Sequence, residues 1–218
     1  FDIGAYDGGT VQMLLTAGVK KIICVEPNPQ SYYKIIGRYN CEPRVEAINK
    51  LLTSKIQNNH PFFVSKMHPP ISTASKEWIT ESNLAKEGAD ENNVPYEWGE
   101  EIKVDTTTLD EMVSNYGTPE FIKIDVEGYE YEVLLGLTEL LKSTTISFEF
   151  VGEFVNRMKD SVQYLHRLGY NRFGMIEGDV IGNFPTKYHT HTEFCKRMEQ
   201  AFPGSRTDFF GMVFAYYE

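Results

Sequence analysis

Apolar residues along this chain gather in short runs that alternate with amphipathic stretches. After a short first strand at the start of the chain, strand-like runs cover residues 20–26, 44–48, 61–64, 121–125, 145–150, 170–176 and 208–217. Helical spacing of apolar residues covers 10–15, 30–39, 129–141 and 155–168, and Gly169 after the last stretch is a typical helix C-cap. Alternation of this kind predicts an α/β fold with a mostly parallel sheet covered by helices on both faces.

One long polar segment, residues 67–96, interrupts this order. It contains Pro69-Pro70, Gly88 and Asn92-Asn93. Polar segments of this length inside a compact domain are usually functional or disordered. We therefore expect a single domain over residues 1–218, in which 67–96 is a loop or lid over the site with a short helix around Trp78.

Composition excludes several classes of function. The chain has 218 residues and a formal net charge of −10, which argues against a sequence-independent grip on nucleic acid. No apolar run approaches the roughly 20 residues that span a bilayer, so no membrane contact is expected. The three cysteines are widely spaced and form no Cys-x-x-Cys pair, which predicts neither disulfides nor a zinc ribbon and fits a reducing, cytoplasmic setting.

A glycine-rich turn opens the chain, between the first strand and the first amphipathic stretch. Its sequence is Asp-Ile-Gly-Ala-Tyr-Asp-Gly over residues 2–8. Gly4 and Gly8 carry no Cβ, which would let the backbone approach a ligand closely. Glu26 ends the next strand about 20 residues later, where nucleotide-binding βαβ units place the acid that binds a ribose. This pairing predicts a nucleoside cofactor.

Asp2 narrows the choice of cofactor. A carboxylate before the turn would repel a pyrophosphate, and the spacing of the glycines is not Gly-x-Gly-x-x-Gly. The carboxylate of Asp2 instead suits a cationic group, such as the amino group or sulfonium of S-adenosylmethionine. The alternative is a tight strand-helix turn whose Asp caps a helix.

Two carboxylates follow the strand at 121–125. If the strand continued, alternation would place Lys123, Asp125 and Glu127 on one side, at the sheet edge where ligands of open α/β sheets bind. Asp125 and Glu127 are therefore the candidate catalytic residues, which could orient and deprotonate an acceptor hydroxyl, hold the cofactor or share a divalent cation. Glu130 is interpreted as a residue that favours a helix N-terminus.

A second polar cluster, His189-Thr190-His191-Thr192-Glu193, has histidines at i and i+2. Zinc would need further ligands to converge on them. We interpret this cluster as a polar helix start or loop and assign no metal ligand in the chain.

The motifs together resemble the FkbM-type family of S-adenosylmethionine-dependent methyltransferases. The resemblance rests on residues 1–8, on Val-Glu-Pro-Asn-Pro at 25–29, on 107–111, and above all on Phe-Ile-Lys-Ile-Asp-Val-Glu-Gly-Tyr-Glu at 121–130 followed by 133–136. It covers roughly residues 1–150. It implies a class I fold, with a seven-stranded sheet whose last strand is antiparallel, and methyl transfer usually to an oxygen, often on a sugar or secondary metabolite.

The resemblance also assigns residues to the cofactor. It implies that Asp2, Gly4 and Gly8 surround the methionine part of S-adenosylmethionine and that Glu26 binds the ribose. With their neighbours in the two motifs, the expected cofactor-binding residues are Asp2, Gly4, Ala5, Gly8, Glu26 and Pro27.

The sequence thus predicts an O-methyltransferase that uses S-adenosylmethionine on a small-molecule or glycan acceptor. It leaves open whether a divalent cation takes part, which acceptor is used and whether the chain oligomerises. Two other functions remain: a cofactor-binding interaction module without catalysis, and a nicotinamide-dependent oxidoreductase. Retained cofactor binding without turnover would favour the interaction module. Calorimetry with S-adenosylmethionine and with a nicotinamide cofactor would distinguish the oxidoreductase from the methyltransferase.

Overall fold

The computed structural model describes residues 1–178, 183–202 and 209–218. The strands of its main sheet are β1 Asp2–Ile3, β2 Ile22–Val25, β3 Val45–Ile48, β8 Phe121–Ile124, β9 Thr145–Val151, β10 Arg172–Glu177 and β11 Phe210–Tyr216. Within the described residues this sheet has seven strands in the order β10-β11-β9-β8-β1-β2-β3. Strands β3, β2, β1, β8 and β9 are parallel, whereas β11 runs antiparallel between β9 and β10. The predicted fold is confirmed, including the antiparallel last strand.

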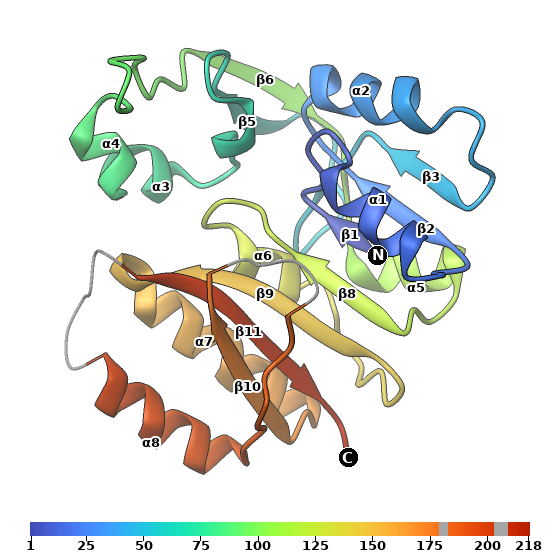
Figure 1. Cartoon of the computed structure of the whole chain (residues 1–218), viewed down its shortest axis with the longest axis vertical. Coiled ribbons are helices and arrows are strands. Elements are labelled where there is room, and N and C mark those ends of the chain that lie inside the picture. Colours follow the sequence, from blue (N-terminus) through green and yellow to red (C-terminus); the bar gives the residue numbers. More distant parts are fainter. Residues whose placement is uncertain (179–182, 203–208) are drawn as a thin grey trace.

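Helices cover both faces of the sheet (Figure 1). They are α1 Gly9–Thr16, α2 Pro29–Tyr39, α5 Leu109–Tyr116, α6 Glu130–Leu134, α7 Val155–Leu168 and α8 His191–Ala201. Helices α1 and α2 pack on one face with Ile22 and Cys24 of β2, while the other four contribute to a larger core. Gly169 ends α7 with φ 115°, as its position in the sequence predicted.

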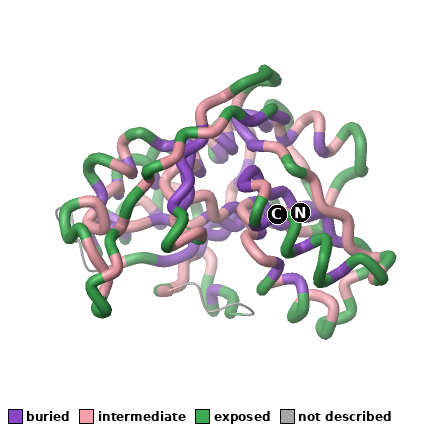
Figure 2. The backbone as a smooth tube through the Cα atoms, turned by 90° about the horizontal axis from the view of Figure 1, so that it is seen from above, coloured by how far each residue is buried: buried purple, intermediate pink, exposed green. Residues whose placement is uncertain are grey.

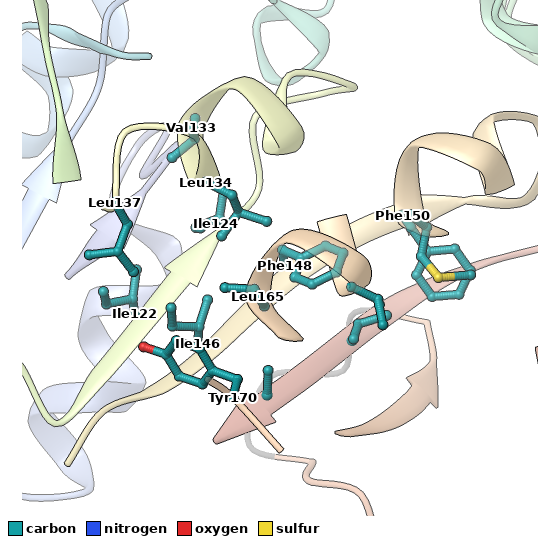
Figure 3. Close-up of a cluster of buried hydrophobic side chains, with 14 of the residues drawn as sticks. Ile122, Ile124, Val133, Leu134, Leu137, Ile146, Phe148, Phe150, Leu165 and Tyr170 are labelled. Atoms are coloured by element: carbon teal, nitrogen blue, oxygen red, sulfur yellow. The ribbon is translucent and has the colours of Figure 1, made fainter. Parts of the chain in front are cut away.

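The larger core lies under the central strands. Figure 3 shows Ile122 and Ile124 of β8 beside Ile146 and Phe148 of β9, with Leu165 of α7 among them. All five side chains are fully buried. Each contributes about 1.5–3 kcal/mol as an upper estimate. Figure 2 shows buried residues along the chain through the middle of the molecule. This packed core supports β8 and β9 up to their carboxyl ends.

The segment between β3 and α5 forms elements of its own. They are β4 Leu51–Leu52, β5 His60–Val64, the 3-10 turn η1 Pro69–Ile71, α3 Lys76–Glu81, α4 Asn83–Glu87, β6 Glu100–Val104 and β7 Thr106–Thr107. Strand β4 pairs with β7 in parallel, and β5 pairs with β6 antiparallel. The short helix expected around Trp78 is α3, whereas α4, β4, β6 and β7 were not predicted.

Hydrogen bonds tie helices α3 and α4 to the C-terminal half of the chain. Arg157 of α7 bonds Glu77 of α3 at 2.8 Å, and the Glu153 carboxylate accepts the backbone N–H of Asn83 at 2.9 Å. Both helices of the polar segment are therefore tied to residues 153–157, which follow β9. Whether it opens stays a prediction.

Two sequence predictions of secondary structure need correction. The helix expected over 129–141 is only α6, because the chain turns beyond Leu134 and Gly136 lies against Thr53, where a Cβ would be 2.5 Å from the Thr53 carbonyl oxygen. Asp208, expected to begin the last strand, lies outside the described residues. In the described ranges, no helix combines the length and apolar character that crossing a bilayer requires.

Candidate functional site

One cavity collects most of the residues that the sequence assigned to cofactor and catalysis. It has a volume of about 390 Å³, and Gly4, Glu26, Pro27, Asp125 and Glu127 line it. These residues come from the ends of β1, β2 and β8, three neighbouring parallel strands. The cavity therefore lies at the carboxyl ends of the strands, where open α/β sheets bind ligands.

Glu26 is held in place by the backbone on both sides. Its Oε2 accepts the N–H of Tyr6 and its Oε1 accepts the N–H of Asn28, each at 2.8 Å. Burial raises the pKa of this carboxyl to about 8, against the opposing effect of the two hydrogen bonds. Each oxygen keeps a lone pair beyond the bond it accepts, so the side chain can also receive two hydroxyl groups of a ribose.

The glycine turn is shaped by its contacts within the protein. A Cβ on Gly4, which has φ 81°, would lie 1.7 Å from the carbonyl oxygen of Asp125. A Cβ on Gly8 would lie 2.7 Å from the ring of Tyr39. Ala5 is buried in the cluster beneath α1 and α2. The two glycines therefore let the turn pack closely on the rest of the protein, a reason that the sequence did not reveal. Of Gly4, Ala5 and Gly8, only Gly4 lines the cavity.

Asp2 lies beneath the cavity rather than on its surface. The side chain is 1 % exposed, and neither oxygen has a hydrogen-bond partner among the described residues. Burial raises the pKa of Asp2, although Lys123, with its Nζ 3.9 Å from Oδ1, opposes that rise. Lys123 also bonds Asp125 at 2.8 Å. Lys123 therefore links Asp2 of the first strand to Asp125, which follows β8. The role of Asp2 toward a cofactor stays a prediction.

Residues 125–130 form a tight loop after β8, here called the carboxylate loop. The strand ends at Ile124, and Glu127 and Gly128 are left-handed, with φ 59° and 82°. The strand alternation used for the sequence prediction does not extend to Glu127. The loop instead turns back on itself, and Thr73 donates a hydrogen bond of 2.7 Å to the Glu127 carbonyl.

Glu130 closes this loop. Its Oε1 accepts the N–H groups of Val126 at 3.0 Å and of Gly128 at 3.2 Å. The side chain is 8 % exposed, and burial raises its pKa to about 7. Glu130 begins α6, as the sequence suggested. Its side chain in addition holds the backbone on either side of Glu127.

Three carboxylates meet above the loop. Asp125, Glu127 and Glu149 each offer an oxygen, and these oxygens lie within 4.8 Å of one another. Burial, followed by the charges of Asp125 and Glu127, raises the pKa of Glu149 well above its ordinary value. This spacing matches the oxygen ligands of a divalent cation. The same arrangement also suits a proton shared between carboxylates.

Sequence reasoning missed two residues around this loop, Glu149 and Thr73. Glu149 is the only charged residue of β9, whose neighbours alternate around it, and the pairing of Ile124 with Phe148 places Asp125 next to Glu149 in register. A charge inside an apolar strand was the signal that could have found it. Thr73 had no such signal, because only the folding of residues 67–96 brings it to Glu127.

The histidine cluster has a structural role. Thr190 caps α8 by accepting the N–H of Glu193, and the Glu193 carboxylate in turn accepts the N–H of Thr190. This capping box confirms the interpretation of residues 189–193 as a polar helix start.

Of two solved structures that this chain resembles, the first shares this architecture. A crystal structure of a methyltransferase FkbM from Methylobacillus flagellatus KT superposes with a TM-score of 0.54 at 12 % identity, over 99 % of this chain and 42 % of that one. A precorrin-6y C5,15-methyltransferase from Geobacter metallireducens GS-15 gives a TM-score of 0.45 at 11 % identity, over 100 % of this chain and 78 % of that one. The search of curated proteins gives no match. This chain thus spans about two fifths of the length of the first structure.

The sequence supplies the family assignment. The model of the methyltransferase FkbM domain matches residues 2–172. This range contains the glycine turn, Glu26 and the carboxylate loop, and it makes up most of the chain. The protein therefore belongs to the methyltransferase FkbM domain family.

Proposed function

We propose that this protein is an S-adenosylmethionine-dependent methyltransferase that methylates a hydroxyl oxygen of a sugar or secondary metabolite. One observation carries the proposal: the ribose-binding candidate Glu26 and the catalytic candidates Asp125 and Glu127 line the same cavity. Family membership supports methyl transfer, and the cofactor and the oxygen acceptor are our inference.

The residues of the cavity fit this cofactor. Glu26 presents a fixed carboxylate at the end of β2, with lone pairs for a ribose diol. Pro27 and Leu51 add apolar lining to the cavity, which suits the flat face of an adenine. Asp125 and Glu127 are negative groups, which suit the sulfonium end. A pyrophosphate would meet these carboxylates as like charges.

The chemistry asks little of the protein beyond positioning. S-adenosylmethionine, when bound, supplies an electrophilic methyl group whose transfer leaves the C–S electron pair on sulfur. Glu127 accepts the proton of the attacking hydroxyl, and Asp125, fixed by Lys123, accepts a hydrogen bond that orients it. General bases of this kind contribute roughly 10²–10⁴-fold to a rate, and holding the reactants in line contributes more.

Calorimetry tests the cofactor assignment. We expect binding of S-adenosylmethionine and S-adenosylhomocysteine and no measurable binding of NAD. Binding of NAD alone would refute the proposal. Methyl transfer is then followed with labelled S-adenosylmethionine on a panel of hydroxyl compounds, and binding without transfer to any of them would favour the interaction module.

The carboxylate cluster allows two versions of the base role. In one, Glu149 keeps its proton and donates a hydrogen bond to one of the other two carboxylates. In the other, Asp125, Glu127 and Glu149 would hold a divalent cation in place of that proton, and the cation would supply Lewis-acid chemistry. Chelator that abolishes transfer, with recovery on added magnesium or manganese, selects the second version. Transfer that is insensitive to chelator selects the first.

A further inference from the structure

Thr73 joins the carboxylate loop to the segment between β3 and α5, here called the inserted segment. The residue is fully buried. Its backbone N–H and carbonyl pair with Phe63 of β5, at 3.0 and 2.8 Å. Its hydroxyl donates to the Glu127 carbonyl at 2.7 Å and accepts the N–H of Ser75 at 2.9 Å. Every polar group of Thr73 therefore has a partner, and one partner is the backbone of the candidate base.

The residues just before Thr73 form part of a cavity wall. Pro69, Pro70 and Ser72 line the cavity at the carboxyl ends of β1, β2 and β8, here called the first cavity. A second cavity, of about 450 Å³, begins two residues beyond Thr73, where Ser75 lines it. A ligand in the first cavity would therefore contact the residues that lead directly into Thr73.

The turn η1, which carries these prolines, is held at both ends. It closes through hydrogen bonds from the N–H of Ile71 to the His68 carbonyl at 3.1 Å and from the N–H of Ser72 to the Pro69 carbonyl at 3.2 Å. From outside the turn, the Trp98 indole N–H donates to the Ile71 carbonyl at 2.7 Å. Proline rings fix the φ angles of the turn. The turn therefore moves as one body, and a movement at its outer end reaches the residue that follows Ser72.

Glu127 is the residue of the carboxylate loop that most needs support. Its φ of 59° is unfavourable for a residue that carries a side chain. Glu130 accepts the N–H groups on either side, from Val126 and Gly128. Thr73 donates to the carbonyl between them. Because the backbone sets the direction of a side chain, these bonds also fix where the Glu127 carboxylate points.

We infer that Thr73 is a positioning residue for Glu127, and that the inserted segment sets the carboxylate loop through it. The inference rests on the proposed function for the role of Glu127 and adds a residue that controls this role. The turn that walls the first cavity is thereby joined to the group that acts there. Loosening the inserted segment, at Thr73 or at the outer end of η1, loosens the carboxylate loop as well.

Hydrogen exchange of backbone amides, followed by NMR on the protein without ligand, tests the bond. Thr73→Val keeps the shape of the side chain and removes the hydroxyl, whereas Thr73→Ser keeps the hydroxyl. We expect the amides of Val126 and Gly128 to exchange roughly five- to tenfold faster in Thr73→Val, which corresponds to the loss of one hydrogen bond. In Thr73→Ser they should exchange at nearly the wild-type rate. Equal exchange in the wild type and in Thr73→Val would overturn the inference.

Thr80→Val is the matched control within the inserted segment. The exposed Thr80 hydroxyl donates to the Lys76 carbonyl at 2.9 Å. This variant therefore loses the same kind of bond and should leave the two loop amides unchanged. The amides of β9 are an internal control. If they exchange faster by the same factor in Thr73→Val, the substitution acts on global stability and the inference fails.

Trp98→Phe tests whether the outer end of the turn reaches the loop. It removes the donor to the Ile71 carbonyl and keeps an aromatic ring. Exchange should become faster at Ile71 and also at Val126 and Gly128, and unchanged loop amides would overturn the inference even if Thr73→Val does not fold. In the double variant with Thr73→Val, Trp98→Phe should add nothing at the loop, because the connection is already broken. Additive effects would contradict a path through Thr73.

Kinetics separate a positioning role from a structural one. In the labelled methyl transfer assay, Thr73→Val should lower kcat about tenfold or more with a nearly constant KM for S-adenosylmethionine, and Thr73→Ser should restore it. A raised KM with unchanged kcat would contradict the positioning role. S-adenosylhomocysteine is titrated separately by calorimetry. If it binds and Thr73→Val exchanges like the wild type, only this inference fails; if it does not bind and the exchange pattern holds, only the proposed function fails.

Discussion

Glu130 offers the sharpest test of how the carboxylate loop is built. The perturbation is a pair of substitutions, Glu130→Gln and Glu130→Ala. The side-chain oxygen of Gln can still accept the N–H groups of Val126 and Gly128, whereas Ala leaves both without their acceptor. Between these two donors lies Glu127, with φ 59°, a backbone conformation that costs a non-glycine residue roughly 1–2 kcal/mol. The loop therefore depends on the bonds that Glu130 accepts.

The pKa of Glu130 sets the sign and size of the effect. Burial raises it from 4.5 to about 7. The folded state thus holds a proton that the unfolded state has released, so stability from the protonated carboxyl is fully present below pH 4.5 and is lost as the pH rises through 7. At about 1.4 kcal/mol per pH unit, this loss amounts to at most about 3 kcal/mol. Glu130→Gln is neutral throughout and escapes it.

Urea unfolding at pH 5 and pH 8 measures the effect. We expect Glu130→Gln to match the wild type near pH 5 and to exceed its unfolding free energy at pH 8 by up to about 3 kcal/mol. Glu130→Ala should lose roughly 1–3 kcal/mol even at pH 5, because two buried donors are left unpaired. The exposed Glu139→Gln serves as the control. A wild type and a Glu130→Gln variant with the same pH dependence would refute this reasoning.

Four further outcomes follow from the site. Glu26→Ala should weaken S-adenosylhomocysteine binding by about 1–3 kcal/mol in calorimetry, and unchanged affinity would remove its ribose role. Glu127→Gln should lower turnover about 10²–10⁴-fold with nearly constant cofactor affinity; wild-type turnover would leave it a loop residue. Hydrogen exchange over 67–96 should slow when ligands bind, and identical exchange would argue against a lid. Gly4→Ala should destabilise the fold in thermal melts, because its Cβ would meet the Asp125 carbonyl.

The sequence was a good guide wherever one local pattern decides the structure. Apolar runs placed the central strands, and helical spacing ending at Gly169 placed α7. The glycine turn and Glu26 were found from their spacing, and Gly4 of that turn and Glu26 both line the first cavity. In each case the information lies within a few neighbouring residues, where propensity and burial agree.

The sequence was a poor guide where distant segments meet. Strands β4 and β7, which lie more than fifty residues apart, pair over two residues each and carry too short a pattern to be recognised. Glu149 joins Asp125 and Glu127 only through the register of β8 and β9. The sequence marks Glu149 as a charge inside an apolar strand, but only the folded sheet brings it to the other two carboxylates.

The packing of Gly4 against Asp125 has a consequence for any dissection of the site. The turn that leads into α1 and the loop that carries the carboxylates touch through backbone atoms, and Lys123 joins Asp2 to Asp125 beneath them. In the proposed function, cofactor binding and acceptor activation therefore rest on one unit. A change in that backbone moves both, whereas a side-chain change such as Glu127→Gln leaves the backbone in place. Only substitutions of the second kind can separate binding from catalysis here.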